Sequence, residues 1–282
     1  MSLFVELKAR FDEARNAGWV RRLEEAGANV AYGVVGLKNH AKLALVVRRE
    51  GDELRRYVHV GTGNYNAATA RVYTDLGLFS ADPELAADVN DLFNQLTGSS
   101  HAPTGAFRRL RVAPAGLLPW LLETIEAEAA RARAGEPAGI RAKLNGVADP
   151  QVVQALYAAS QAGVPVELVV RGICTLRPGV PGLSERIRVV SRLGRFLEHA
   201  RIYEFGAGER TRYYIGSADW RPRNLRRRIE ALVPVEDAEA RRRLRAQLDQ
   251  ELSDPAAWVL HPDGWYSRGV VGGPEKALDS LR

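Results

Sequence analysis

Cysteine is nearly absent from this sequence, because Cys174 is the only one among 282 residues. A single thiol excludes an internal disulfide and any metal site built from several cysteines. Long apolar runs are missing too: none approaches the roughly 18 residues that a membrane-spanning helix needs, and no signal peptide opens the chain. These absences favour a soluble, intracellular protein.

Lysine is scarce as well. Only five of the 40 cationic residues are lysine, which leaves 35 arginines in a chain of net charge +6. The planar guanidinium of arginine suits phosphate oxygens, although a GC-rich genome produces the same enrichment. The 46% of hydrophobic residues is enough for the cores of two ordinary domains.

The sequence repeats itself. The segment 5–10, which ends in Arg10, returns as the segment 166–171, which ends in Arg171. His40-Ala41-Lys42 returns as His199-Ala200-Arg201, at arginine-to-histidine spacings of 30 and 28 residues. We therefore predict a duplicated fold whose halves, related by a pseudo-twofold axis, bring both histidines to one seam.

The first half begins later in the repeat than the second. Before residue 166 the second half has a helical run at 117–134, a strand at 139–147 and a helical run at 150–162, whereas four residues precede residue 5. We expect the first half to lack these three elements, and the chain to be a piece of a longer protein.

Helical and β signals alternate along the chain, which predicts α/β sheets with helices on their faces. Asp82 and Asp149 each precede a proline and are expected N-caps. The clearest strands are expected at 30–35, 41–48, 54–60, 164–170, 200–204 and 212–215. Helices are expected at 11–27, 83–96, 117–134, 150–162 and 238–252.

Three regions are predicted: a first, truncated catalytic domain at 1–104, a second at 105–260 and a C-terminal tail at 261–282. The linker is the Gly, Ser, Thr and Pro-rich stretch 97–104. The residues after Ser253 show no clear periodicity, so a poorly packed extension is expected there.

Each histidine carries a cation two positions on, Lys42 after His40 and Arg201 after His199, and this spacing places both side chains on one side of a strand. Such a cation would hold a phosphate against the imidazole, whose neutral nitrogen can attack phosphorus. With two histidines, one can be the nucleophile while the other transfers a proton at the leaving oxygen.

Small-residue corners follow each histidine motif, at 61–64 and 216–219. Their backbone N–H groups would bind an anion, and Asn64 or Asp219 could orient the neighbouring imidazole. Arg171 ends a strand and is expected to face the seam with its counterpart Arg10. A cluster of five arginines at 221–228 would suit a polyanion, or be a solvated face.

In these motifs the chain resembles class 1 polyphosphate kinase, over nearly all of residues 4–260. The matching stretches are 5–13, 36–43, 59–66, 69–75, 170–174, 196–201 and 217–220. The resemblance implies two phospholipase D-like domains and a cytoplasmic, possibly membrane-associated, homo-oligomeric enzyme. That enzyme would move the terminal phosphate of ATP reversibly onto inorganic polyphosphate through a phosphohistidine, with Mg²⁺ as cofactor.

The resemblance also assigns residues. His40 matches the phosphorylated histidine, and His199 a nucleotide-site residue and acid/base partner. Tyr73 and Arg171 match nucleotide contacts. Arg10 matches an arginine associated with Mg²⁺, but a guanidinium has no lone pair for a metal, so we assign it to phosphate oxygens beside the ion.

Two other functions fit the same residues. A phospholipase D-like phosphodiesterase or nuclease would use both histidines on a diester, and a non-enzymatic polyanion-binding module would need only the arginines. The expected partners are ATP, ADP and polyphosphate. A sequence-specific nucleic acid is not expected. Formation of phosphohistidine from ATP separates the kinase from both alternatives.

Overall fold

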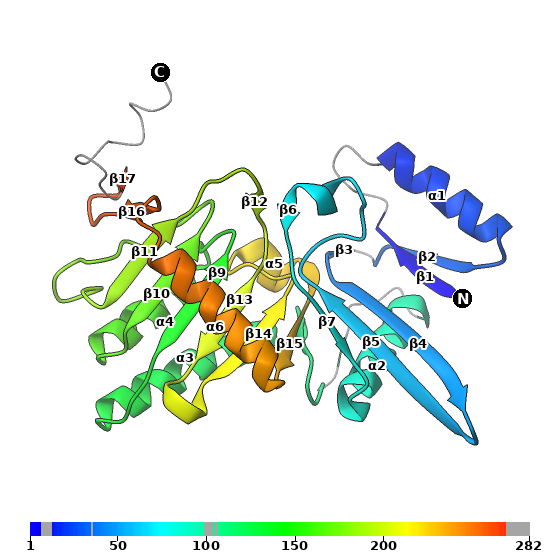
Figure 1. Ribbon diagram of the computed structural model, residues 1–282, viewed down its shortest axis with the longest axis horizontal. Coiled ribbons are helices and arrows are strands. Elements are labelled where there is room, and N and C mark those ends of the chain that lie inside the picture. Colours follow the sequence, from blue (N-terminus) through cyan, green and yellow to red (C-terminus); the bar gives the residue numbers. More distant parts are fainter. Residues whose placement is uncertain (7–12, 35, 99–103, 105–106, 269–282) are drawn as a thin grey trace.

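The computed structural model describes residues 1–6, 13–34, 36–98, 104 and 107–268. It confirms the α/β class, with sheets covered by helices (Figure 1). In the first half the elements are β1 (Ser2–Val5), α1 (Glu13–Glu25), β2 (Asn29–Tyr32), β3 (Lys38–Asn39), β4 (Lys42–Glu50), β5 (Glu53–Gly61), a 3-10 turn (Thr69–Arg71), β6 (Tyr73–Thr74), β7 (Gly77–Ser80) and α2 (Pro83–Gly98).

The second half is longer. Its elements are β8 (Arg111–Ala113), α3 (Leu117–Arg133), β9 (Ile140–Leu144), α4 (Pro150–Gln161), β10 (Val166–Val170), β11 (Ile187–Ser191), β12 (Leu197–Glu198), β13 (Ile202–Phe205), a 3-10 turn (Gly208–Arg210), β14 (Arg212–Gly216), α5 (Pro222–Arg226), β15 (Arg228–Val235), α6 (Ala238–Leu252), β16 (Trp258–Leu260) and β17 (Tyr266–Arg268).

Both halves use the same strand plan. In each, a parallel pair (β1 with β2, β10 with β11) is followed by an antiparallel run of three strands (β4-β5-β7, β13-β14-β15). A helix then begins after an N-cap aspartate, Asp82 before α2 and Asp237 before α6, whose carboxylates accept the N–H of Leu85 and Ala240 at 2.8 Å each. The predicted duplication is therefore confirmed.

The halves differ at one position in this plan. In the second half β9 lies between β10 and β13 and is flanked in sequence by α3 and α4. Within the described part of the first half there is no counterpart of these three elements, as the sequence predicts. Instead, β1, β4 and α2 line a mostly apolar cavity of about 650 Å³.

The main sheet runs β17-β16-β11-β10-β9-β13-β14-β15, with β3 and β8 beside β15. Helices α3 and α4 pack on one face with residues such as Ile140 and Leu168, and α6 covers the other (Figure 1). The core under α6 continues through Ile229 and Leu110 to Val58 of β5 and Leu92 of α2. Because one apolar cluster contains residues of both halves, the two halves pack as one body.

Two short parallel pairings cross between the halves. β3 of the first half pairs with β15, and β12 of the second half pairs with β6. The two crossings are equivalent under the repeat, because β3 and β12 each immediately precede a predicted catalytic histidine.

Most predicted elements are present within a few residues of their expected bounds, and Asp149 caps α4 as predicted, accepting from Gln151 N at 3.1 Å. The expectation of a poorly packed extension after Ser253 is wrong for residues 258–268. There β16 pairs with β11 at Val190 and Ser191, and β17 pairs with β16, so part of the edge of β11 is covered. Within the described part of the chain, no helix is both long and apolar enough to cross a membrane.

Candidate active site

His40 lies between β3 and β4, at the crossing of the first half into the second. Its backbone N–H donates to the carbonyl of Ile229 at 2.8 Å, and its Nδ1 lies 2.8 Å from Oε2 of Glu230. A carboxylate only accepts, so this contact places the imidazole proton on Nδ1 and leaves the Nε2 lone pair available. Nε2 of His40 makes no hydrogen bond with any described residue.

Glu230 belongs to β15 and is fully buried. Its two oxygens also accept hydrogen bonds from Ser217 Oγ and, at 2.6 Å, from Asn224 Nδ2. Burial alone would raise the pKa of Glu230, but His40 and Lys42 outweigh it and the pKa lies below its usual value. The carboxylate is therefore ionised, and its position is fixed by donors on three sides.

His199 has the equivalent environment in the second half. It follows β12, and its Nδ1 lies 2.8 Å from Oδ1 of Asp75, which also accepts from Thr62 Oγ1 at 2.7 Å. Nη1 of Arg201 lies 3.2 Å from Nε2 and 3.3 Å from Nδ1 of His199, so the guanidinium lies against the ring. The ring of Tyr73 packs on the imidazole, with 5.0 Å between ring centroids. Unlike the imidazole of His40, the imidazole of His199 has a guanidinium against its ring.

The two carboxylates are exchanged between the halves. Asp75 of the first half orients His199 of the second, and Glu230 of the second half orients His40 of the first. Each acid stands 14 residues after the glycine that opens a small-residue corner, Gly61 or Gly216. Equal spacing in matched frames is the signal by which sequence reasoning could have found Asp75 and Glu230, which it missed.

The expectation that Asp219 or Asn64 orients an imidazole is wrong for Asp219. Its carboxylate instead accepts from Arg201 Nε at 3.2 Å and from the backbone N–H of Asn145 at 2.8 Å. Among the described residues, Asp75 and Glu230 are the carboxylate partners of the two imidazoles, and Asn64 hydrogen-bonds neither histidine.

Two predicted cations adjoin the histidines, and a third lies beside them. Lys42 is 5% exposed and donates to the carbonyl of His40, and burial lowers the pKa of Lys42 to about 7. Arg201 is buried and reaches from His199 to the carbonyl of Thr62, at 3.4 Å. Arg171 donates to Asn145 Oδ1 at 3.0 Å, and its charge and that of Arg201 repel each other.

The charges show that this is one site. Burial lowers the pKa of His40 and of His199, and the cationic groups of both Lys42 and Arg201 lower each pKa further, against the opposing carboxylates Glu230 and Asp75. Both imidazoles are therefore favoured in the neutral, nucleophilic form. The structure thus brings together His40, His199, Tyr73, Lys42, Arg171 and Arg201, whereas Arg10 lies outside the described residues.

The arginine cluster at 221–228 divides in the structure. Arg228 is half-buried, and its charge acts on Lys42 and Glu230, while Arg221 acts on Asp219. Arg226 turns away and binds the capping carboxylate of Asp149. Only part of the cluster therefore adjoins the site.

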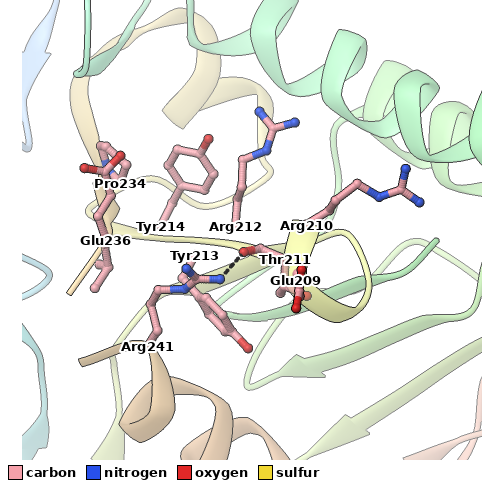
Figure 2. A pocket seen from close by; sticks show the side chains of 10 residues that line it. Glu209, Arg210, Thr211, Arg212, Tyr213, Tyr214, Pro234, Glu236 and Arg241 are labelled. Carbon is pink, nitrogen blue, oxygen red and sulfur yellow. Dashed lines mark hydrogen bonds between the residues drawn. The ribbon is translucent and has the colours of Figure 1, made fainter. Parts of the chain in front are cut away.

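A separate cavity of about 350 Å³ lies in the second half, at the end far from the two histidines. Figure 2 shows the side chains that line it. Arg210 and Arg212 come from the β13–β14 hairpin, and Arg241 of α6 donates to the carbonyl of Thr211. That hairpin joins the ends of β13 and β14 that are farthest from His199 and Gly216. The cavity therefore belongs to another surface, where three arginines stand with two carboxylates, Glu209 and Glu236.

Within the described residues, no group of three or more His, Cys, Asp and Glu side chains is placed to hold a metal ion. The carboxylates of the site, Asp75, Asp219 and Glu230, are already engaged by hydrogen-bond donors or cations. The described chain thus does not fit a resident Mg²⁺ ion held by protein ligands alone.

The fold and site define a duplicated α/β protein with a paired-histidine centre at the junction of its halves. The family model described as polyphosphate kinase C-terminal domain 1 matches residues 1–102, and the one described as C-terminal domain 2 matches residues 110–278. The chain belongs to the polyphosphate kinase family.

Curated relatives support this membership. The chain is 57% identical over 281 residues to a polyphosphate kinase of Streptomyces coelicolor, covering 99% of this chain and 37% of that protein. It is 55% identical to one of Thermosynechococcus vestitus, over 94% of this chain and 36% of that protein. A crystal structure of polyphosphate kinase from Porphyromonas gingivalis covers all of this chain with a TM-score of 0.86 at 36% identity, and 43% of that protein is matched. The chain therefore spans well under half the length of these relatives.

Proposed function

We propose that this chain is the catalytic half of a polyphosphate kinase, which transfers the terminal phosphate of ATP reversibly to inorganic polyphosphate through a phosphohistidine. The observation that carries the proposal is the pair of imidazoles, each hydrogen-bonded at Nδ1 to a carboxylate of the other half and flanked by Lys42 or Arg201. Such an arrangement provides a nucleophile, a proton-transfer group and phosphate-binding cations in one place.

We assign the nucleophile to His40. Its Nε2 lone pair has no partner among the described residues, whereas the guanidinium of Arg201 lies against the ring of His199. In the first step Nε2 of His40 forms a bond to the γ-phosphorus while the bond from phosphorus to the bridging oxygen breaks, and ADP leaves with that electron pair. In the second, a terminal polyphosphate oxygen attacks phosphorus and the N–P bond breaks, which restores neutral His40.

The other residues then take supporting roles. His199 is placed to exchange a proton at the leaving or attacking oxygen, and Lys42 and Arg201 hold the transferred phosphoryl oxygens. Tyr73 and Arg171 contact the nucleotide. Mg²⁺ enters as the MgATP substrate, since phosphate oxygens supply ligands that the described side chains do not.

The partners that follow are ATP, ADP and polyphosphate. A sequence-specific nucleic-acid partner is not expected, because phosphate contacts carry no base information. A homo-oligomeric state and a cytoplasmic location remain predictions, as do the domain boundaries at residues 104 and 260.

The test is acid-labile labelling from γ-labelled ATP. We expect label on wild-type protein, none on His40→Gln, and normal labelling on the control His59→Gln, because His59 bonds Tyr65 outside the site. The same variants are made in the Streptomyces coelicolor relative with its matching segment replaced by this chain. Label that survives His40→Gln, or cleavage of bis-nitrophenyl phosphate without any labelling of either protein, would overturn the proposal, the latter in favour of a phosphodiesterase.

A further inference from the structure

Lys143 is a buried cation that the proposed chemistry does not use. It lies in β9, is 2% exposed, and its Nζ is 2.6 Å from Oε2 of Glu198 and 2.5 Å from Oε1 of Glu251. Burying three charges carries a desolvation penalty that their attraction must offset, and apolar side chains often fill such space at least as well. A buried charge cluster of this kind is best explained by a geometry that it fixes.

What it fixes is the strand beside His199. Glu198 immediately precedes His199, and its Oε2 also accepts from Thr74 Oγ1 at 3.0 Å. The backbone N–H of His199 donates back to Thr74, at 3.3 Å to the carbonyl and 3.2 Å to Oγ1. Thr74 stands between Tyr73 and Asp75, the two residues that pack on and orient the imidazole. A chain of contacts therefore runs from Lys143 to the environment of His199.

The strand before His40 has stronger backbone support than the strand before His199. Its strand β3 pairs with the start of β15, an eight-residue strand of the main sheet. In contrast, β12 and β6 have two residues each and form a separate two-stranded sheet, above the junction in Figure 1. At the position of Glu198 the first half has Asn39, and its described residues include no counterpart of β9. The histidine with the weaker backbone support is the one that has the buried lysine.

We propose that Lys143 is a positioning residue for His199, acting through Glu198 and Thr74 to hold β12 against β6 across the junction of the halves. Its importance for phosphoryl transfer rests on the proposed function, but the positioning itself is a property of the folded chain. Removal of the charge leaves Glu251 with only the amide of Gln247, and Glu198 with only Thr74 and, at 3.6 Å, Arg192. The β12–β6 pairing therefore opens while the β3–β15 pairing beside His40 stays closed.

The test compares Lys143→Met with Arg141→Met. Arg141 lies two residues earlier in β9 and on the same face, and it bridges Asp249 of α6 and Glu204, so its loss removes a similar ion cluster without touching β12. Amide hydrogen exchange is measured in the 282-residue chain at residues 72–75 and 197–199, and at 38–40 as the internal reference. We expect about tenfold faster exchange at the first two segments in Lys143→Met only.

A second variant keeps the test decisive if Lys143→Met does not fold. Glu198→Gln retains the shape and a possible bond to Thr74 but removes the charge that Lys143 holds, and the same local opening is expected. If either folded variant exchanges like Arg141→Met, or if protection falls equally at 38–40, the proposal is wrong. Because exchange needs no turnover, this result is independent of whether the chain transfers phosphate. In an active protein, Lys143→Met should lower the rate of transfer to polyphosphate more than it changes KM for ATP.

Discussion

Replacement of Glu230 by glutamine is the most direct test of the exchanged carboxylates. Gln has nearly the same shape, so Ser217 and Asn224 keep a neighbour, but the charge that holds the Nδ1 proton of His40 is lost. The amide can turn an N–H toward Nδ1, which moves the imidazole proton to Nε2. That nitrogen would then have no lone pair with which to attack phosphorus.

The expected loss of His40 labelling in Glu230→Gln can be taken from a comparable change in another enzyme class. In a hydrolase triad, the corresponding change of a carboxylate to an amide lowers kcat about 10⁴-fold through the wrong tautomer, and we expect a loss of about 10³- to 10⁴-fold in labelling of His40. The structural cost should be about 2 kcal/mol, the range for one hydrogen bond to a charged group.

The pH dependence has a definite sign. The pKa of Glu230 lies below its usual value in the folded protein. Its contribution to stability is thus fully present above the unfolded-state pKa of about 4.3 and is lost as the pH falls through the folded value. Glu230→Gln should therefore lose more stability at pH 7 than at pH 3.

The assay combines labelling with imidazole titration. NMR of the five histidines, with His40 assigned by its absence in His40→Gln, reports a property that needs no turnover. Glu230 raises the pKa of His40 against the effect of burial, so Glu230→Gln should lower the pKa of His40 further. Glu204→Gln is the control, because Glu204 is a buried carboxylate that binds Arg141 away from both histidines. Labelling at the wild-type rate together with an unchanged titration of His40 would refute the reasoning.

Four further outcomes are expected. Asp75→Asn should slow both the labelling of His40 by ATP and the discharge to ADP or polyphosphate about 10²- to 10⁴-fold, the usual range for a lost acid/base group, because labelling and discharge to ADP are one step run in opposite directions; single-turnover labelling and chase experiments measure both, and unchanged rates would contradict a proton-transfer role for His199. Polyphosphate should bind the chain with an affinity that falls steeply with salt, and a salt-independent dissociation constant would count against phosphate contacts. A bound phosphate should raise the pKa of Lys42 from about 7, so binding at pH 8 should take up a proton, detected by calorimetry in buffers of different ionisation enthalpy and absent in Lys42→Met. The chain alone should make about a thousandfold less polymer than its full-length relatives and self-associate in sedimentation experiments through the unpaired edges of β1 and β4, whereas a fully active monomer would disprove both expectations.

The exchange of carboxylates makes the halves chemically dependent on each other. Neither His40 nor His199 has its orienting acid within its own half, so a separated half would keep a histidine and lose its partner. The shared core from Val58 to Ile229 and the two crossing strand pairs hold the exchange in place.

The sequence by itself indicated most of the secondary structure and the duplication, and it singled out six candidate residues that the structure brings together. Apolar periodicity and N-caps such as Asp149 are local signals, and they are strong where a helix or strand has one buried face. The repeat added information that neither half contains alone. His40 and His199 are ordinary histidines singly, but the matching segments around both singled them out as candidate catalytic residues.

Only the tertiary structure decided which acid serves which histidine. Glu230 lies 190 residues from His40 in sequence and Asp75 lies 124 residues from His199, so no local pattern connects either pair. Lys143 is likewise 55 residues from Glu198 and 108 from Glu251 in sequence. The position of β16 beside β11 was also not visible in the sequence, because the tail shows no hydrophobic periodicity. Contacts between residues so far apart in sequence form only when both halves pack on a common core. That packing, and not the residues that meet at the junction, sets the geometry of the junction.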